Sequence, residues 1–252
     1  MTGTFINVAT IILGSTLGLF IGEQLSQRAR DTVVAGLGLF TAALGLQMFF
    51  KTENPIIVLL SLLFGGLLGE WWRIESRLEH LGAWLEARFA GEGESARFVQ
   101  GFLTASLLFC VGPMSILGSI QDGLLGDYKL LAIKAVLDGF ASLAFASTLG
   151  IGVMFSIVVV LVYQGGISLA AAQLHGLLNH PAMVNELTAA GGIILLGLAI
   201  SSLLEIKPIR SGNLLPALAI APLLVWLTSA APRWWLASPA PLWWHRLLQV
   251  IP

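Results

Sequence analysis

Charge is what this sequence has least of. Only 27 of its 252 residues are charged, 13 lysines and arginines against 14 aspartates and glutamates. This share of 11% compares with roughly 25% in ordinary soluble domains, and so few polar side chains could not cover the surface of a soluble protein of this length. The net charge of -1 and the lack of a basic tail exclude a nucleic-acid binder, and the apolar composition excludes a disordered chain.

Cysteine is also nearly missing, whereas apolar residues are abundant. Cys110 is the single cysteine, so no internal disulfide can form and a disulfide-stapled secreted module is excluded. Apolar side chains make up 56% of the chain, which also contains 28 glycines, and the mean hydropathy is +0.87. In hydrocarbon each backbone group must be satisfied within its own segment, so each crossing needs about 20 mostly apolar residues in a helix. The composition therefore predicts an all-α bundle of transmembrane helices in contact with the lipid bilayer.

Charge-free stretches predict about eight spans in a single integral membrane domain of residues 1–252, and seven would also fit. The longest stretch is divided at residues 148–152, where closely spaced glycines favour a turn. The third span is short for a straight crossing and is expected to be tilted. The predicted spans cover residues 4–22, 32–50, 55–70, 98–120, 129–148, 152–171, 187–204 and 212–231.

Three further segments are expected at the membrane interface. Residues 71–90 place apolar side chains at helical spacing among charged ones, which predicts an amphipathic helix lying in the interface. The tail, residues 232–252, carries four tryptophans among prolines and is expected to form an interfacial belt. Residues 172–185 are interpreted as a short interfacial element between the sixth and seventh spans.

The distribution of lysine and arginine predicts the topology. One side of the predicted bundle carries eight of these residues outside the spans and the other side carries four. Since cytoplasmic loops are enriched in positive charge, residues 71–97 are predicted to be cytoplasmic and both termini outside. The eight are Arg28, Arg30, Arg73, Arg77, Arg88, Arg97, Lys207 and Arg210, and the four are Lys51, Lys129, Arg233 and Arg246.

The fourth span contains Gly112 and Pro113 near its middle. Proline removes a backbone donor and clashes with the preceding turn, so the helix must bend or break there. A break at membrane depth is tolerated only against protein or a wet cavity, and broken helices expose backbone groups to substrates in many transporters. Plain kinks are also common in membrane helices, so the structural and the functional interpretations are evenly balanced.

Lys134 and Asp138 are the two charges predicted to lie within a span. They are four residues apart, on one helix face, and could pair directly. An unpaired charge at mid-bilayer costs at least roughly 2.5–3.5 kcal/mol, so the pair is expected to face the protein interior or water. The alternative is a neutralised structural pair. Candidate residues of a substrate or ion pathway are Gly112, Pro113, Ser115, Ser119, Gln121, Asp122, Lys134, Asp138 and Gln164.

Glycine and polar residues elsewhere point mainly to helix packing. Gly14, Gly18 and Gly22 form a small-residue stripe, and Gly65 and Gly69 repeat its spacing. Such stripes let helices approach closely, within the chain or in a homo-oligomer. Asn7 and Gln47 are costly in lipid, and each needs a hydrogen-bond partner.

The first three and the last three predicted spans share an order of elements. Each set has a glycine-rich middle helix followed by a turn with a charged residue and proline. An offset of five spans would give the two units opposite orientation, as in the inverted repeats of many secondary transporters.

No metal or cofactor site and no enzyme are expected. His175 and His180 are five residues apart, whereas a helical metal-binding pair is more naturally four apart. Cys110 with either histidine is the sole combination of nucleophile and base worth considering, and no recognisable motif surrounds it.

Three segments carry a resemblance to a known family. They are residues 110–123 (CVGPMSILGSIQDG), residues 134–139 (KAVLDG) and residues 163–165 (YQG), together with the start at residues 3–7 (GTFIN). The chain resembles the YqgA/YdfK-like family of uncharacterised bacterial inner-membrane proteins over nearly its whole length. The resemblance implies a multi-pass protein of the bacterial inner membrane and supplies no substrate. From the helix break at Gly112 and Pro113 and the pair Lys134 and Asp138 we expect a transporter or ion-conducting protein for a small solute or ion. A membrane scaffold or assembly protein is the alternative, ahead of an intramembrane enzyme.

Overall fold

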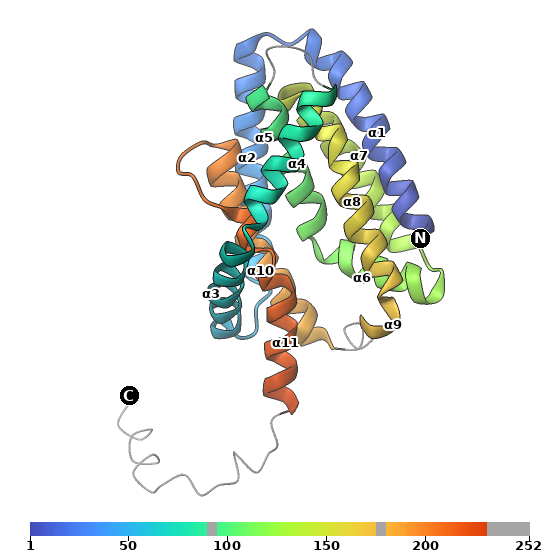
Figure 1. Ribbon diagram of the computed structural model, residues 1–252, viewed down its shortest axis with the longest axis vertical. Coiled ribbons are helices and arrows are strands. Elements are labelled where there is room, and N and C mark those ends of the chain that lie inside the picture. Colours follow the sequence, from blue (N-terminus) through green and yellow to red (C-terminus); the bar gives the residue numbers. More distant parts are fainter. Residues whose placement is uncertain (90–94, 175–179, 231–252) are drawn as a thin grey trace, which may run out of the picture.

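The computed structural model describes residues 1–89, 95–174 and 180–230, and the part of the chain that it describes is helical throughout (Figure 1). The predicted tail, residues 232–252, lies outside the described residues. The helices are α1 (Thr2–Glu23), α2 (Gln27–Phe49), α3 (Pro55–Trp72), α4 (Ile74–Phe89), α5 (Ser95–Val111), α6 (Pro113–Leu125), α7 (Lys129–Leu149), α8 (Gly152–Leu169), α9 (Ala171–Leu174), α10 (Pro181–Leu198) and α11 (Ala217–Ala230), with a π-helical turn at Ala199–Leu203 and a 3-10 turn at Ser211–Leu214.

The helix ends follow local capping chemistry. The Ser26 side chain accepts a hydrogen bond from the backbone N–H of Ala29 at the start of α2, and the Asn54 side chain accepts one from Ile56 at the start of α3. Proline occupies the first turn of α3, α6 and α10, where its missing N–H costs nothing. Gly126 ends α6 with a φ of 67°, in the left-handed region that glycine adopts without strain.

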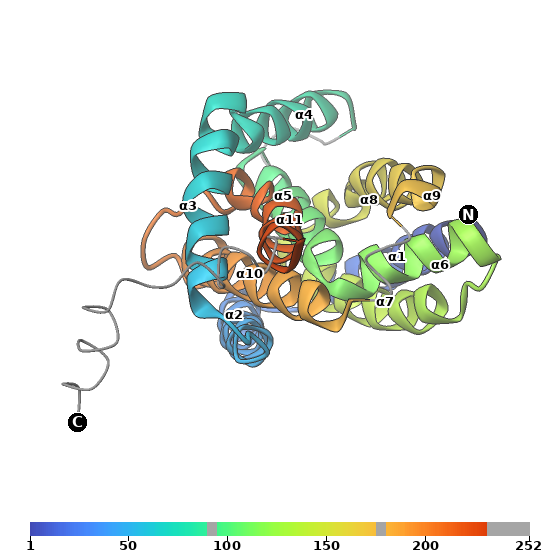
Figure 2. The same ribbon diagram turned by 90° about the horizontal axis from the view of Figure 1, so that it is seen from below.

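Helices that are long and apolar enough to cross a membrane cover the predicted spans. Seven single helices meet this description within the described residues, and α5 with α6 adds an eighth if the pair counts as one span. The axis bends by 63° between α5 and α6, at the predicted break. The third helix lies across the direction of α2, since Figure 2 shows α3 running across the view while α2 is seen nearly end-on.

The seventh span begins earlier than expected. The sequence predicts its start at residue 187, but α10 begins at Pro181 and includes Glu186, which is 1% exposed. The charge of Glu186 predicts that the span starts after it, whereas the structure buries this carboxylate and satisfies it with hydrogen bonds. Its two oxygens accept hydrogen bonds from the Thr52 hydroxyl at 2.7 Å and from the backbone N–H groups of Glu53 and Asn54, both at 2.8 Å.

Both glycine stripes pack against helices of the same chain. A β-carbon built on Gly18 would lie 2.3 Å from the Leu143 carbonyl oxygen of α7, and one built on Gly69 would lie 1.9 Å from the Asn213 carbonyl oxygen. Because real contacts at a β-carbon are much longer, only glycine permits these approaches. The stripes are therefore used within the chain, where they fix α1 against α7 and α3 against the segment that leads into α11.

The two proposed repeat units contact each other helix by helix. α1 contacts α8, α2 contacts α10, and α3 contacts α11. The α2–α10 pair is closest at Gly45 and Gly192, where each glycine faces the carbonyl oxygen of the other. This pairing is what two inverted units would produce, and the inverted repeat remains a prediction that the pairing supports.

Candidate functional site

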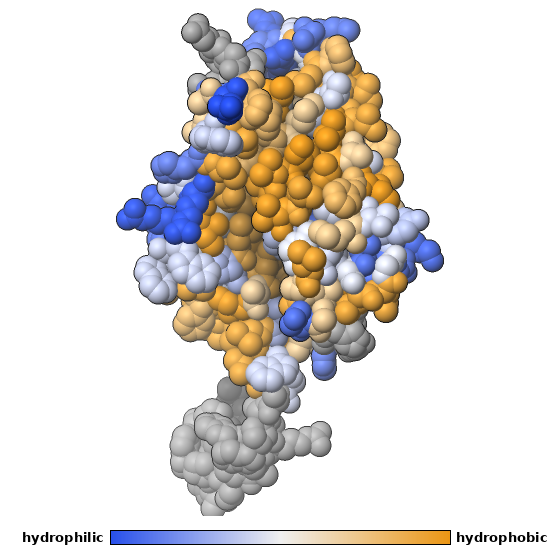
Figure 3. Space-filling model, turned by 45° about the vertical axis from the view of Figure 1, so that its right-hand side comes forward, coloured by the Kyte–Doolittle hydropathy of each residue, from blue (hydrophilic) through white to orange (hydrophobic). Residues whose placement is uncertain are grey.

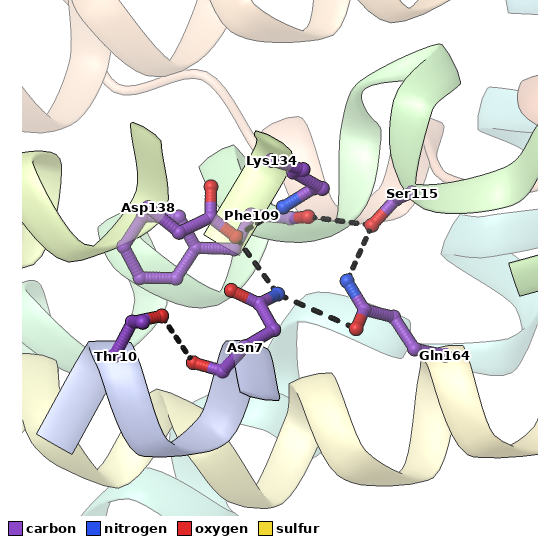
Figure 4. Close-up of polar contacts among 7 residues, drawn as sticks. All are labelled: Asn7, Thr10, Phe109, Ser115, Lys134, Asp138 and Gln164. Atoms are coloured by element: carbon purple, nitrogen blue, oxygen red, sulfur yellow. Dashed lines mark hydrogen bonds and ion pairs between the residues drawn. The ribbon is translucent and has the colours of Figure 1, made fainter. Parts of the chain in front are cut away.

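A cluster of polar side chains lies where α1, α6, α7 and α8 meet beside the α5–α6 break (Figure 4). We call it the central polar cluster. All of its members are buried, and Asn7, Ser115 and Gln164 are 0% exposed. Its members are Asn7, Ser115, Lys134, Asp138 and Gln164.

Lys134 and Asp138 form the ion pair that their spacing predicts. The Lys134 ammonium contacts Asp138 Oδ2 one helical turn away on α7, and the two residues are 5% and 7% exposed. The ammonium also lies 5.7 Å from the ring centroid of Phe109, within the range of a cation–π attraction. Because the two charges cancel, the cluster is close to neutral, which lowers its cost in an apolar surrounding.

Carboxamides from two other helices complete the cluster. Asn7 Nδ2 of α1 donates to Asp138 Oδ2 at 2.9 Å and to Gln164 Oε1 of α8 at 3.3 Å. Gln164 Nε2 in turn donates to the Ser115 hydroxyl of α6 at 2.9 Å. A continuous path of hydrogen bonds therefore leads from the carboxylate on α7 to the first turn of α6.

Ser115 links this path to the break in the fourth span. Its hydroxyl donates to the Phe109 carbonyl oxygen at 2.9 Å, and its backbone N–H donates to the Gly112 carbonyl oxygen at 3.0 Å. Pro113 has no N–H to donate and begins α6, so the last carbonyls of α5 are left without helical partners. Ser115 thus satisfies the freed backbone and joins it to Gln164.

A second polar group lies further along α6. Asp122 Oδ2 accepts from the backbone N–H of Gly3 at 2.9 Å and lies 3.1 Å from the Met1 nitrogen. The Ser119 carbonyl oxygen accepts from the Ser168 hydroxyl of α8 at 3.0 Å. Ser115, Ser119 and Asp122 are spaced by four and three residues, so they share one face of α6. The polar face therefore extends about 10 Å beyond Ser115 at a rise of 1.5 Å per residue.

Several buried oxygens of α1, α6 and α7 have no partner among the described groups. They belong to buried side chains, where an unsatisfied polar atom costs roughly 1–3 kcal/mol. All of them can accept a hydrogen bond. They are Thr4 Oγ1, Asn7 Oδ1, Ser119 Oγ, Asp122 Oδ1 and Ser142 Oγ.

The predicted residues separate into two sets. Ser115, Lys134, Asp138 and Gln164 come together, with Gly112 and Pro113 forming the adjacent break, whereas Ser119 and Asp122 continue the same face of α6. Gln121 is half-buried on α6, and none of the described hydrogen bonds joins it to the cluster. Asn7 is not among the candidate pathway residues predicted from the sequence, although a carboxamide in an apolar helix is itself a signal. Gln47 lies on the exposed side of α2.

The charged pair is buried by packing in this conformation. Lys134 and Asp138 are 5% and 7% exposed, and neither lines the five cavities described for this part of the chain. A cavity beside the break is apolar and is lined by Cys110 and Ile116.

A separate set of polar contacts joins the α3–α4 junction to the segment before α11. The backbone N–H of Gly212 donates to Glu75 Oε2 at 2.7 Å, and the Glu75 N–H donates to Asn213 Oδ1 at 2.8 Å. Arg210 Nη1 lies 2.6 Å from Glu70 Oε1. Partial burial raises the pKa of the Glu75 carboxyl above its ordinary value, and this outweighs the opposite effect of the Gly212 hydrogen bond.

Comparisons with known proteins agree with this membrane architecture. A family model described as "Protein of unknown function (DUF554)" matches residues 2–226. The chain is 33% identical over 234 residues to "Uncharacterized membrane protein YdfK" of Bacillus subtilis (strain 168), covering 91% of this chain and 98% of the relative. It is 31% identical over 222 residues to "Uncharacterized protein YqgA" of Escherichia coli (strain K12), covering 87% and 94%. No solved structure matches the chain. Together with the apolar helices, these relatives identify a multi-pass integral membrane protein.

Proposed function

The chain belongs to the DUF554 family, also represented by YqgA and YdfK, and on that premise we propose that it is a transporter or ion-conducting protein for a small solute or ion. The observation that carries the proposal is the central polar cluster beside the broken fourth span. Ionisable groups within membrane helices are expensive, and they commonly mark substrate or ion pathways. Here such a pair is joined by hydrogen bonds to the break between α5 and α6 in the fourth predicted span.

The cluster could respond to a solute in two ways. A cation or proton that binds Asp138 would compete with Lys134, and an anionic group would compete for the Lys134 ammonium. Either event would change the hydrogen bonds of Asn7 and Gln164. The change would reach the Ser115 hydroxyl, which bonds the backbone carbonyl freed at the break. The buried arrangement corresponds in this proposal to the closed state of an alternating-access cycle.

Reconstitution into liposomes tests the proposal. Wild-type protein would be screened for currents and tracer flux with monovalent cations, anions and small zwitterions, each at several pH values. We expect Asp138→Asn to abolish any flux found, because the amide keeps the shape of the carboxylate without its charge. Asp127→Asn, a charge removal at an exposed site in the α6–α7 loop, is the matched control and should retain flux. Unchanged flux in Asp138→Asn would exclude the coupling role.

A membrane scaffold is the second candidate, and the burial of the charged pair favours it. An ion pair that touches no cavity can serve simply to fix α7 against α1 and α8. In that case Asp138→Asn would lower the unfolding temperature, and no tested solute would cross the bilayer in the wild type. We propose no enzymatic role, since Cys110 lies in the wall of an apolar cavity.

For orientation we propose an inner-membrane protein with both termini outside and α4 on the cytoplasmic side. The support is the excess of lysine and arginine at that side. Reporter fusions at residue 252 and in the α2–α3 loop should both be active in an extracytoplasmic compartment. Activity of either fusion in the cytoplasm would overturn this orientation.

A further inference from the structure

An apolar cavity of about 380 Å³ lies beside the helix break, and neither Lys134 nor Asp138 lines it. Side chains from α4, α5, α6, α8, α9, α10 and α11 form its wall, and Cys110 is one of them. Figure 3 shows one face of the molecule hollowed along its middle, with apolar side chains on the floor and sides. Representative lining residues are Leu78, Leu107, Ile116, Ile167, Leu187 and Leu218.

A second cavity of about 410 Å³ continues the first one. The two share Leu174, Ala219 and Pro222 in their walls, so together they form one groove along α11. We call it the apolar groove. Its far end is lined by Trp226 and His180. Both volumes fall within the range of about 300–1,000 Å³ that is usual for small-molecule sites.

The length of the groove fits a lipid chain. Leu218 and Trp226 both line it, and they are separated by about 12 Å along α11 at 1.5 Å per residue. Beyond Leu218 the groove continues to Leu107 and Cys110 on α5. Half of a hydrocarbon core of about 30 Å is about 15 Å, which is the depth filled by the acyl chains of one leaflet.

The two ends of the groove differ in polarity. The inner end is lined mainly by aliphatic side chains, with Ser106, Cys110 and Tyr163 among them, whereas Gln173 and His180 line the outer end. His180 is exposed and directly precedes the first turn of α10, whose N-terminal N–H groups favour a negative charge. Trp226 is 53% exposed there, and tryptophan prefers the level of the lipid headgroups. An anionic headgroup joined to a hydrocarbon chain matches this polarity.

We propose that the apolar groove binds one acyl chain of a bilayer phospholipid, with the chain end near Cys110 and the phosphate near His180. The protein is embedded in a bilayer, so acyl chains are the apolar groups available to an open apolar groove. Because lipid tails are as apolar as the groove wall, a chain would be held there by close packing and by contacts of its headgroup. The site is distinct from the central polar cluster and does not depend on whether the protein transports anything.

Cys110 provides a reporter, because the chain has no other cysteine. Wild-type protein would be purified in mild detergent, its bound phospholipid measured by native mass spectrometry, and the alkylation rate of Cys110 by N-ethylmaleimide followed by intact mass. The rate would then be measured after delipidation and after addition of dioleoylphosphatidylglycerol or of oleic acid. We expect delipidation to speed alkylation several-fold, and the phospholipid to reverse this.

Two variants test the same groove. Ala219→Trp fills it, whereas Ala43→Trp places the same side chain at an exposed position of α2. Ala219→Trp should lose the bound phospholipid, and Ala43→Trp should retain it. Equal retention by the two variants, or an alkylation rate that ignores phospholipid in the wild type, would overturn the proposal. Protection by oleic acid alone would also overturn it, since the occupant would then be a free fatty acid. The wild-type measurements remain decisive even if Ala219→Trp does not fold.

Discussion

Gly14 of α1 and Gly139 of α7 bring two helix backbones into direct contact. A β-carbon built on Gly14 would lie 2.1 Å from the Gly139 carbonyl oxygen. We therefore expect Gly14→Ala to separate α1 from α7 and to lower the free energy of unfolding by about 3 kcal/mol or more. The added methyl group would meet the backbone of α7, which cannot move aside as the end of a flexible side chain can. Thermal unfolding in detergent, followed by size-exclusion chromatography, would measure the loss. The control is Gly36→Ala, because nothing lies within 4 Å of that position, and a small gain in stability is expected there from helix propensity.

The ion pair between Lys134 and Asp138 predicts strongly non-additive mutational effects. Lys134→Met leaves a buried carboxylate without its counter-charge and should cost about 3–5 kcal/mol. Replacing both residues, as in Lys134→Met with Asp138→Leu, removes both charges and should recover most of that stability. A double-mutant cycle on unfolding temperatures measures the coupling. Additive losses in the cycle would show that the two charges do not stabilise each other.

Glu186 should matter for stability although it lies far from the central polar cluster. Glu186→Ala leaves the backbone N–H groups of Glu53 and Asn54 without their acceptor, which should cost about 2–5 kcal/mol in total. Glu53→Gln, at an exposed carboxylate in the same loop, should change stability by no more than about 0.5 kcal/mol. Chemical unfolding of both variants is the measurement. If the two variants lose equal stability, Glu186 does not hold the α2–α3 loop.

The raised pKa of Glu75 predicts that the stability of the protein depends on pH. Its pKa is raised in the folded protein, mainly by burial, so the folded state binds a proton more tightly than the unfolded state does. The stability that this group contributes is present below its ordinary pKa of 4.5 and is lost as the pH rises through the raised value. Unfolding temperatures measured across this window should fall less steeply with pH in Glu75→Gln than in the wild type. Glu23→Gln, at an exposed position, should follow the wild-type curve.

Local features of the fold were predictable from the sequence because membrane helices obey a simple physical rule. Charge-free runs located the helices, Pro113 located the break, and a spacing of four residues located the Lys134–Asp138 pair. The start of α10 could not be placed in this way, because the Glu186 carboxylate accepts hydrogen bonds from a loop more than 130 residues earlier in the chain. Spacing within one helix says which side chains share a face, but not which helix covers that face.

The same limit applies to the candidate site. The sequence identified Asn7 as a costly group that needed a partner, but the partner depends on how α1 packs against α7 and α8. Conversely, the apolar groove has no signature in the sequence, since its walls are ordinary aliphatic residues on several helices. A cavity forms where packed helices leave space unfilled, and the hydrophobic periodicity of a single helix does not show where that happens.

The hydrogen bond between Asn7 and Gln164 can form only late in the synthesis of the protein. The two residues are 157 positions apart, and a ribosome adding roughly 5–20 residues per second needs about 8 to 30 s to bridge that distance. Asp138, the other partner of the Asn7 carboxamide, follows it by 131 positions, so for most of that interval α1 is complete while neither partner has been synthesised. The Asn7 carboxamide of the amino-terminal helix therefore lacks these partners until the second half of the chain is synthesised. Until then it is surrounded by water, lipid or the insertion machinery.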